Sequence, residues 1–251
     1  MAICKLCQQE RPLIRSHVIP DAFNRDIKGD HPQSPVMISN NPEQHPKRRP
    51  GGHYDEELVC EPCERLFSRG DDYAAQFFLN QFREDGQPLN ASTGEVMAYR
   101  YDNIDYRKLK LFAISLLWRV AASSIVFCAR VTIGPHEERA RQLILANDPG
   151  APEDFSVLIA RWVAAPNRQG LLQSQFSPYC ARIDAVNEVK LFLAGAVIHV
   201  KVDKRLYPAP FPELILRPDA PLYVIARELE GSKDLLALRP ALDAHVARLR
   251  R

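Results

Sequence analysis

The sequence has no long uninterrupted apolar run and little net charge. Its 33 basic and 31 acidic side chains give a formal net charge of +2, so overall charge does not by itself indicate a polyanionic partner. The most apolar stretch, residues 109–131, is interrupted by Arg119 and Arg130, which predicts a buried helix rather than a membrane span. The chain begins without an apolar leader, so we expect no signal peptide.

The remaining composition is that of an ordinary folded protein. Hydrophobic residues make up 46% of the chain and charged residues 25%, which argues against disorder of the whole chain. A length of 251 residues fits one large domain or two small ones and is enough to bury a core. We find no internal repeat. In residues 105–251 we find no phosphate-binding loop and no nucleophile–base pairing.

Four of the six cysteines form two Cys-x-x-Cys pairs, Cys4-Lys-Leu-Cys7 and Cys60-Glu-Pro-Cys63. Two such pairs supply the four thiolates that structural zinc prefers. Paired spacing in a chain without a secretion signal favours metal over disulfides, so we expect one Zn²⁺ ion and a reducing, cytoplasmic location. The alternative is four buried thiols without an ion. The other two cysteines, which we expect to be core thiols, are Cys128 and Cys180.

Patterning along the chain predicts an α+β fold in two parts. Residues 1–100 are expected to hold the zinc site, a long polar loop over residues 30–52 and the helix that follows the site. Residues 101–251 are expected to form a larger companion domain of helices and mixed strands. The expected helices cover residues 60–67, 71–82, 106–126, 135–145 and 235–250. The expected strands cover residues 155–163, 189–202 with a turn at 194–196, and 222–226.

A histidine motif lies between the two cysteine pairs. The order is Arg15-Ser16-His17-Val-Ile-Pro20, then Gly51-Gly52-His-Tyr-Asp55, then the second pair followed by Glu64. Over about the first 70 residues, this order resembles the zinc-supported HNH, or His-Me finger, endonucleases. The resemblance implies a zinc-bound ββα finger, in which His17 ends the first strand and faces the helix across one divalent ion.

The same resemblance implies a role for each matching residue. His17 would be the general base that activates water for attack on a phosphodiester. Glu64 would be the helix-borne ligand of a catalytic Mg²⁺ or Mn²⁺ ion that stabilises the leaving oxygen. Asp55 occupies the place of the residue that orients the base. The sequence differs from the family at Ser16, where an acid or a histidine is usual and where a hydroxyl is a weak ligand for a hard cation.

Structural interpretations of these residues stay open beside the catalytic ones. His17 could pack beside the zinc site, Glu64 could be a solvated acid in a first helical turn, and Asp55 could be an ordinary turn residue. Basic side chains could contact phosphate or simply be solvated. The candidate nucleic-acid contacts are Arg15, Lys47, Arg48, Arg49 and Arg65.

The leading hypothesis is therefore a metal-dependent HNH-like nuclease, with DNA as the expected substrate and RNA as the second choice. A wider similarity to uncharacterised bacterial and phage-associated proteins suggests a setting in phage defence. The alternative is a non-catalytic zinc module that binds nucleic acid or a protein partner, which the hydroxyl at Ser16 favours. In a third interpretation the zinc is purely structural and the activity lies in residues 105–251.

Overall fold

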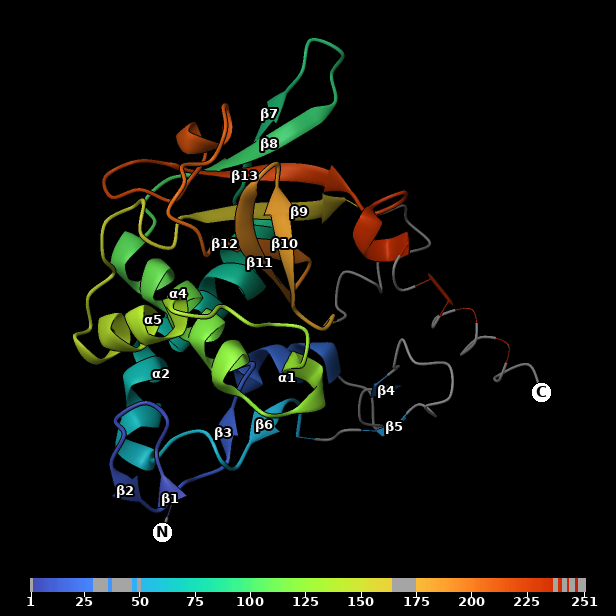
Figure 1. Cartoon of the computed structure of the whole chain (residues 1–251). Coiled ribbons are helices and arrows are strands. Elements are labelled where there is room, and N and C mark those ends of the chain that lie inside the picture. The colour runs from blue at the N-terminus through green and yellow to red at the C-terminus, as the bar shows by residue number, and fades with distance from the viewer. Residues whose placement is uncertain are drawn as a thin grey trace.

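The computed structural model describes residues 2–28, 36–37, 47–48, 51–163, 175–236, 239–240, 243 and 247, with backbone alone at 36–37 and 47–48. In this part helices and strands are mixed, which confirms the predicted α+β class (Figure 1). The N-terminal strands lie at one end, a helical layer lies in the middle, and a sheet lies beyond it. No helix in the described ranges combines the length and the apolarity needed to cross a bilayer.

The largest sheet has seven strands in the order β10-β11-β12-β9-β13-β8-β7. Its pairs are antiparallel except β13 with β9, which is parallel. The strands are β7 Gln87–Asn90, β8 Val96–Tyr101, β9 Val157–Val163, β10 Tyr179–Ile183, β11 Val186–Leu193, β12 Ala196–Lys201 and β13 Leu222–Glu228. The predicted boundary after residue 100 falls inside β8, so the sheet takes strands from both sides of it.

Six short strands form three further antiparallel pairs, β1 with β2, β3 with β6, and β4 with β5. They are β1 Ala2–Ile3, β2 Glu10–Arg11, β3 Ser16–His17, β4 Val36–Met37, β5 Lys47–Arg48 and β6 Tyr54–Asp55. The helices are α1 Asp21–Lys28, α2 Glu61–Gln76, α3 Phe82–Glu84, α4 Tyr106–Ala122 and α5 His136–Leu145. A π-helical stretch, Phe77–Gln81, joins α2 to α3, and 3₁₀ turns cover Val126–Cys128 and Phe211–Glu213.

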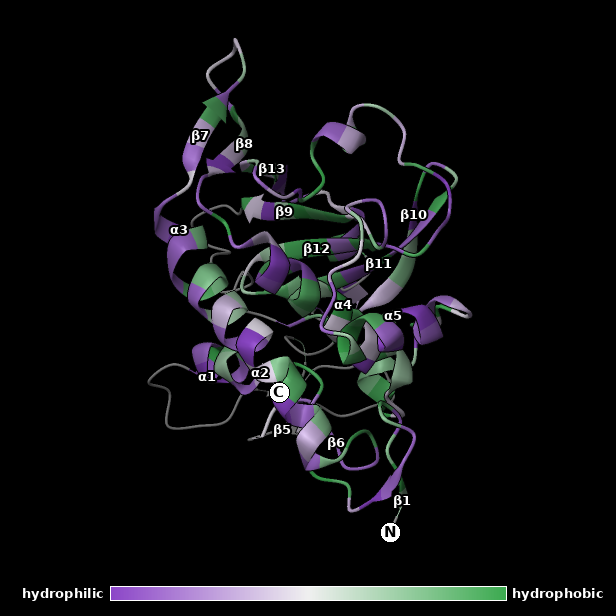
Figure 2. Ribbon diagram, turned by 90° about the vertical axis from the view of Figure 1, so that its left-hand side faces the viewer, coloured by the Kyte–Doolittle hydropathy of each residue, from purple (hydrophilic) through white to green (hydrophobic). Residues whose placement is uncertain are grey.

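Helix α4 is the centre of the core. Most of its length is buried, because α2 and α5 pack against it and it also contacts β12 of the sheet. Hydrophobic residues concentrate on α4 and on the central strands (Figure 2). One buried cluster extends from Cys4 through Trp118 to Val224, so the cysteine end and the sheet share a continuous core. Burial of this kind is the main stabilising term for such a fold.

The predicted long helix and the following amphipathic helix are confirmed as α4 and α5. The strands predicted over 155–163, 189–202 and 222–226 are confirmed as β9, β11–β12 and β13. Ala194 and Gly195 turn the β11–β12 hairpin with φ of 51° and 82°, the left-handed backbone that such two-residue turns require. Most of the predicted terminal helix and of the long loop over 30–52 lies outside the described residues.

The prediction of two separate helices over 60–67 and 71–82 was wrong about the break between them, since α2 runs unbroken from Glu61 to Gln76. Gly70, which lies between the two predicted ranges, is buried inside the helix. A Cβ atom there would lie 3.4 Å from the Phe112 backbone, so α2 and α4 pack closely against each other at this position. The sequence pattern alone does not distinguish a glycine inside a helix from one that ends a helix.

A fully buried arginine ties the helical layer to the N-terminal strands. Arg119 of α4 donates two hydrogen bonds to the Asp71 carboxylate of α2, at 2.9 and 2.7 Å, and one to the His17 carbonyl of β3, at 3.1 Å. Its guanidinium also lies 4.7 Å from the Phe67 ring centroid. Three elements that are distant in sequence therefore meet at one charge.

Replacing this arginine should destabilise the fold. Arg119→Met removes the guanidinium and leaves the Asp71 carboxylate and the His17 carbonyl without their partner. We expect the free energy of unfolding to fall by about 3–5 kcal/mol, as for other broken buried pairs. Chemical denaturation measures it. The control is Arg100→Met, because Arg100 pairs with Asp102 at the surface and should contribute little. Equal effects of the two changes would contradict the assigned role.

Candidate metal centre and adjoining polar site

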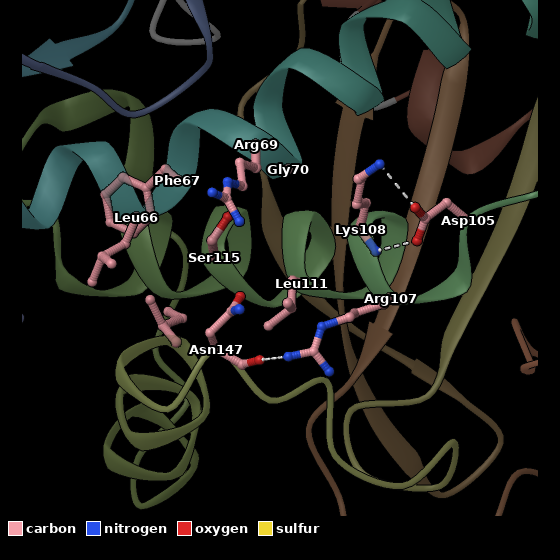
Figure 3. Close-up of a pocket in the computed structure, with 11 residues that line it drawn as sticks. Leu66, Phe67, Arg69, Gly70, Asp105, Arg107, Lys108, Leu111, Ser115 and Asn147 are labelled. Carbon is pink, nitrogen blue, oxygen red and sulfur yellow. Dashed lines mark hydrogen bonds and ion pairs between the residues drawn. The ribbon is translucent and has the colours of Figure 1, made fainter.

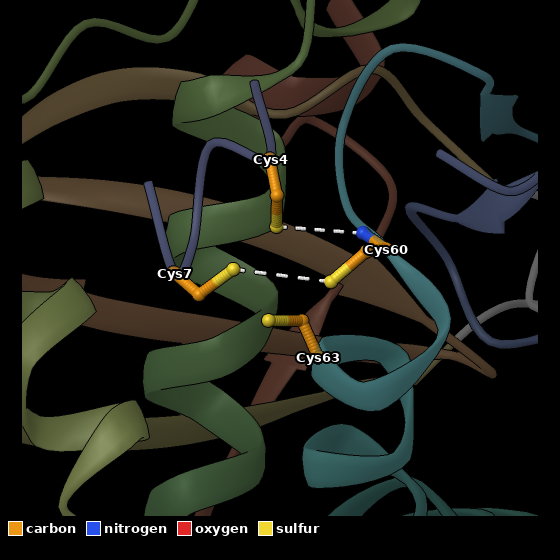
Figure 4. Close-up of side chains that lie close together, drawn as sticks. All are labelled: Cys4, Cys7, Cys60 and Cys63. Atoms are coloured by element: carbon orange, nitrogen blue, oxygen red, sulfur yellow. Dashed lines mark hydrogen bonds between the residues drawn. The ribbon is translucent and has the colours of Figure 1, made fainter. Parts of the chain in front are cut away.

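The four paired cysteines converge at one point, although more than fifty residues separate the two pairs. Cys4 and Cys7 lie in the turn between β1 and β2, where Gln8 has a φ of 57° and donates to the Cys4 carbonyl. Cys60 caps the N-terminus of α2, and Cys63 lies in its first turn. The four Sγ atoms lie within 4.8 Å of one another (Figure 4).

Backbone hydrogen bonds align the two segments. Lys5 N donates to the Leu58 carbonyl at 3.0 Å, Ile14 N donates to the Val59 carbonyl at 3.1 Å, and Leu13 forms a β-bridge with Cys60. Cys60 N also donates to Cys4 Sγ at 3.4 Å. The thiols are thus held by a rigid frame on both sides, which reduces the entropy lost when an ion binds.

The pKa shifts of the clustered thiols are consistent with a site that binds a cation. Burial raises the pKa of Cys4, but hydrogen bonds from backbone N–H groups outweigh it and lower this pKa to about 7. Burial raises the pKa of Cys60, and burial together with the neighbouring thiols raises the pKa of Cys63 well above its usual range. Several thiolates cannot share so small a volume unless a positive charge neutralises them, as a divalent ion does.

The donor set therefore fits zinc. Four sulfur ligands are a common structural zinc set, and three of the four thiols are buried. All four cysteines are free of disulfides. The chemistry of such a closed set is structural, since no position is left for a substrate or a water molecule. Of the other two cysteines, Cys128 is buried as expected. Cys180 is exposed, so the expectation of a core thiol is wrong there.

Zinc content tests this site directly. The purified protein should contain about one zinc ion per chain, and Cys63→Ser should lose it together with much of the thermal stability. Elemental analysis and thermal denaturation with and without a chelator are the measurements. Cys180→Ser is the control, because this exposed thiol lies outside the cluster and should keep both zinc and stability. A wild-type protein that is zinc-free and indifferent to chelator would exclude the site.

Beside the cysteines, two strands and α2 bring the histidine motif and Glu64 into one region. Ser16 of β3 pairs with Asp55 of β6, and His17 pairs with Tyr54. Because side chains alternate along a strand, Ser16 and Asp55 are buried while His17 and Tyr54 are partly exposed. Helix α2 starts six residues after β6, so its first turn follows directly from this strand pair.

Ser16 connects the strand to the helix. Its hydroxyl donates to Oε2 of Glu64 at 2.6 Å, which is a short hydrogen bond to a carboxylate. His17, the next residue, has its Nε2 3.7 Å from Oδ1 of Asp21, and its side chain is 28% exposed. Its ring meets the ring of Tyr54 edge-on, with centroids 6.4 Å apart. Solvent therefore reaches the imidazole, while Arg119 holds its backbone from the core side.

The carboxylate of Asp55 points to other groups. It accepts hydrogen bonds from Glu57 N, Ser123 Oγ and Ser124 N, at 2.8, 2.7 and 3.0 Å. Burial raises its pKa, but these donors outweigh burial and the pKa is lowered. In the described residues, Asp55 thus joins β6 to the end of α4. Any influence on His17 passes through the backbone pairing of the two strands.

The candidate basic residues are spread over several elements. The Arg15 guanidinium lies 3.5 Å from the Tyr54 ring centroid, on the same outer side of the strands as His17. Arg65 of α2 is exposed and pairs with Glu61 of the same helix. Lys47 and Arg48 form β5, and their side chains lie outside the described part of the chain, as does Arg49 entirely.

Three contributors near the candidate site were not predicted from the sequence. Asp21 lies four residues after His17 at the start of α1, and this spacing is a signal that could have been used. Tyr54 contacts both Arg15 and His17, which follows from its register in β6. Arg119 reaches the site from a distance of 102 residues along the chain, and no local pattern indicates that.

A groove lies between α2, α4 and α5, on their outer side (Figure 3). Its rim carries the basic residues Arg69, Arg107 and Lys108, and its one acidic residue, Asp105, pairs with Lys108 at 3.0 Å. The apolar part is formed by Leu66, Phe67, Leu111 and Ile144. Arg107 donates to the Asn147 carbonyl. The groove is therefore net positive and suits an anionic ligand.

Metal ligands cluster at one place in the described ranges. There the four cysteines are the only group of three or more His, Cys, Asp or Glu side chains with ligand atoms close enough to share an ion. His17 and Glu64 would thus offer a further ion at most two such ligands. In comparisons with known proteins, no family model, no curated protein and no solved structure matches this chain.

Proposed function

We propose that this protein is a metal-dependent HNH-like nuclease that hydrolyses phosphodiester bonds, with DNA as its first substrate class. The observation that carries the proposal is the pairing of β3 with β6 next to the N-terminus of α2. Here the hydrogen bond from Ser16 to Glu64 brings the residue before His17 onto the helix. This order agrees with a ββα finger supported by a four-cysteine zinc ion.

In the proposed reaction His17 acts as the general base. Its imidazole is solvent-accessible, as a base that takes a proton from water must be, and Oδ1 of Asp21 lies 3.7 Å from its Nε2. Arg119 fixes the His17 backbone through a 3.1 Å hydrogen bond. Arg15, held against Tyr54, lies on the same face and would contact phosphate.

A catalytic Mg²⁺ or Mn²⁺ ion would be bound by Glu64. The fit is adequate, because Glu64 is partly exposed, one of its oxygens is fixed by Ser16, and no cation in the described ranges pairs with it. Magnesium commonly takes one or two carboxylates and completes its shell with water and substrate phosphate, so a three-ligand protein cluster is not required. Such an ion would supply Lewis-acid stabilisation of the leaving oxygen.

Loss of the base tests the activity. Wild-type protein should nick or cleave plasmid DNA in the presence of Mg²⁺ or Mn²⁺, and His17→Ala should lower the rate by about 10²–10⁴-fold, the usual contribution of a general base. Gel assays under single-turnover conditions measure it. His136→Ala is the matched control, since His136 lies on α5, away from the strand pair. Equal rates for wild type and His17→Ala would reject the proposal.

The second candidate function is non-catalytic binding of nucleic acid. The groove with its three basic residues favours it, and so does the engagement of the Ser16 hydroxyl with Glu64, which removes that hydroxyl as a ligand. Within either function a phage-defence setting and a cytoplasmic location remain part of our proposal. Binding of a protein partner is the outcome that remains if neither DNA nor RNA is bound.

Salt dependence tests the groove. If phosphates contact its rim, changing Arg69 and Lys108 together to glutamine should weaken duplex DNA binding and reduce the slope of log affinity against log salt by about 2. Fluorescence anisotropy across a salt series measures both. The control changes Arg182 and Lys204 to glutamine, since these exposed residues are not among those that line the groove. Identical slopes for the two double variants would exclude the groove as the contact.

A further inference from the structure

Ser16 stands where the HNH endonucleases usually have an acid or a histidine. The contacts of its side chain indicate what it does there. Its side chain is completely buried between β3 and α2. The hydroxyl lies 2.6 Å from Glu64 Oε2, across 48 residues of sequence. A donor at this distance from a carboxylate forms one of the stronger hydrogen bonds available in proteins. Ser16 is therefore a donor to an acid, and a direct cation ligand is not needed at this position.

Glu64 depends on that donor for its orientation. The neighbouring acids of α2 have cationic partners, since Glu61 pairs with Arg65 and Asp71 pairs with Arg119. In the described ranges Glu64 has no ion pair, and its carboxylate repels that of Asp71, whose pKa burial raises and Glu64 raises further. A long side chain with a like charge nearby would otherwise sample several rotamers.

The geometry of the bond leaves the second oxygen usable. Oε2 accepts from Ser16, and Oε1 remains for a hard cation or for a water molecule bound to it. The backbone of Glu64 is also fixed, because its N–H donates to the Cys60 carbonyl at 3.0 Å in the first turn of α2. The hydrogen bond from Ser16 of β3 and the fixed first turn of α2 together hold Oε1 of Glu64 in a single direction.

We infer that Ser16 is a positioning residue, which holds the Glu64 carboxylate so that its free oxygen binds the proposed divalent ion. This inference rests on the proposed function for the identity of the ion. In this role Ser16 orients an acidic ligand and does not itself bind the ion. The direction of this acid is then set by an uncharged neighbour, which adds no further negative charge beside the ion.

Direct ion binding to the zinc-loaded protein provides the test, because it does not depend on catalysis. Mn²⁺ titrations followed by electron paramagnetic resonance should show that Ser16→Ala weakens binding about tenfold, as expected when a hydrogen bond to a charged group is lost. Glu64→Gln should weaken binding at least as much. In the Glu64→Gln background, Ser16→Ala should change the affinity less than twofold, since the two residues act through one contact.

Two further variants separate orientation from folding. Ser16→Thr keeps the hydroxyl and should retain most of the Mn²⁺ affinity. Ser68→Ala, the control, removes an exposed hydroxyl of α2 that bonds to the Arg65 carbonyl of its own helix, and should have no effect. Zinc content and thermal denaturation confirm that each variant is folded. Unchanged affinity in Ser16→Ala, or additive losses in the double variant, would overturn the inference.

The outcomes also distinguish this inference from the nuclease proposal. Ser16-dependent Mn²⁺ binding without cleavage of DNA or RNA would retain the inference and reject the nuclease. His17-dependent cleavage with Mn²⁺ affinity independent of Ser16 would retain the nuclease and reject the inference. A zinc-loaded wild type that binds no Mn²⁺ in the presence or absence of DNA would reject the inference.

Discussion

The convergence of four thiols within 4.8 Å is the constraint on which the N-terminal half depends. It closes a loop of more than fifty residues and holds the β1–β2 turn against the first turn of α2. Closing such a loop costs chain entropy, which the backbone hydrogen bonds on either side and the binding of an ion would offset. Because β3 and β6 lie within the closed segment, their position relative to α2 follows from this closure.

A second constraint fixes the same region from the opposite side. The guanidinium of Arg119 is fully buried and bonds to α2 and to β3 at once, while Asp55 joins β6 to the end of α4. Buried polar contacts of this kind are specific in direction, unlike apolar packing, and they set the strand pair at one angle to the helices. The candidate site therefore lies on a rigid frame, which suits a chemistry that depends on orientation.

The candidate residues differ in the contacts that they make. Ser16 and Glu64 touch each other, His17 is accessible and near Asp21, and Arg15 lies on the same outer face. Asp55 is engaged in structural hydrogen bonds, so its link to His17 is only through paired strands. In the proposed site Glu64 is the metal ligand, so its chemistry would depend on how this carboxylate is oriented.

By itself the sequence determined the features that depend on local spacing. The two Cys-x-x-Cys pairs indicated a four-thiol cluster, and apolar periodicity indicated α4, α5 and the β11–β12 hairpin, because ligand spacing and side-chain direction repeat over a few residues. Only the tertiary structure decided that Gly70 continues α2, that Arg119 reaches His17, and that Ser16 bonds to Glu64. These contacts join residues that are distant along the chain, and their partners are selected by packing of whole elements, which no short pattern encodes.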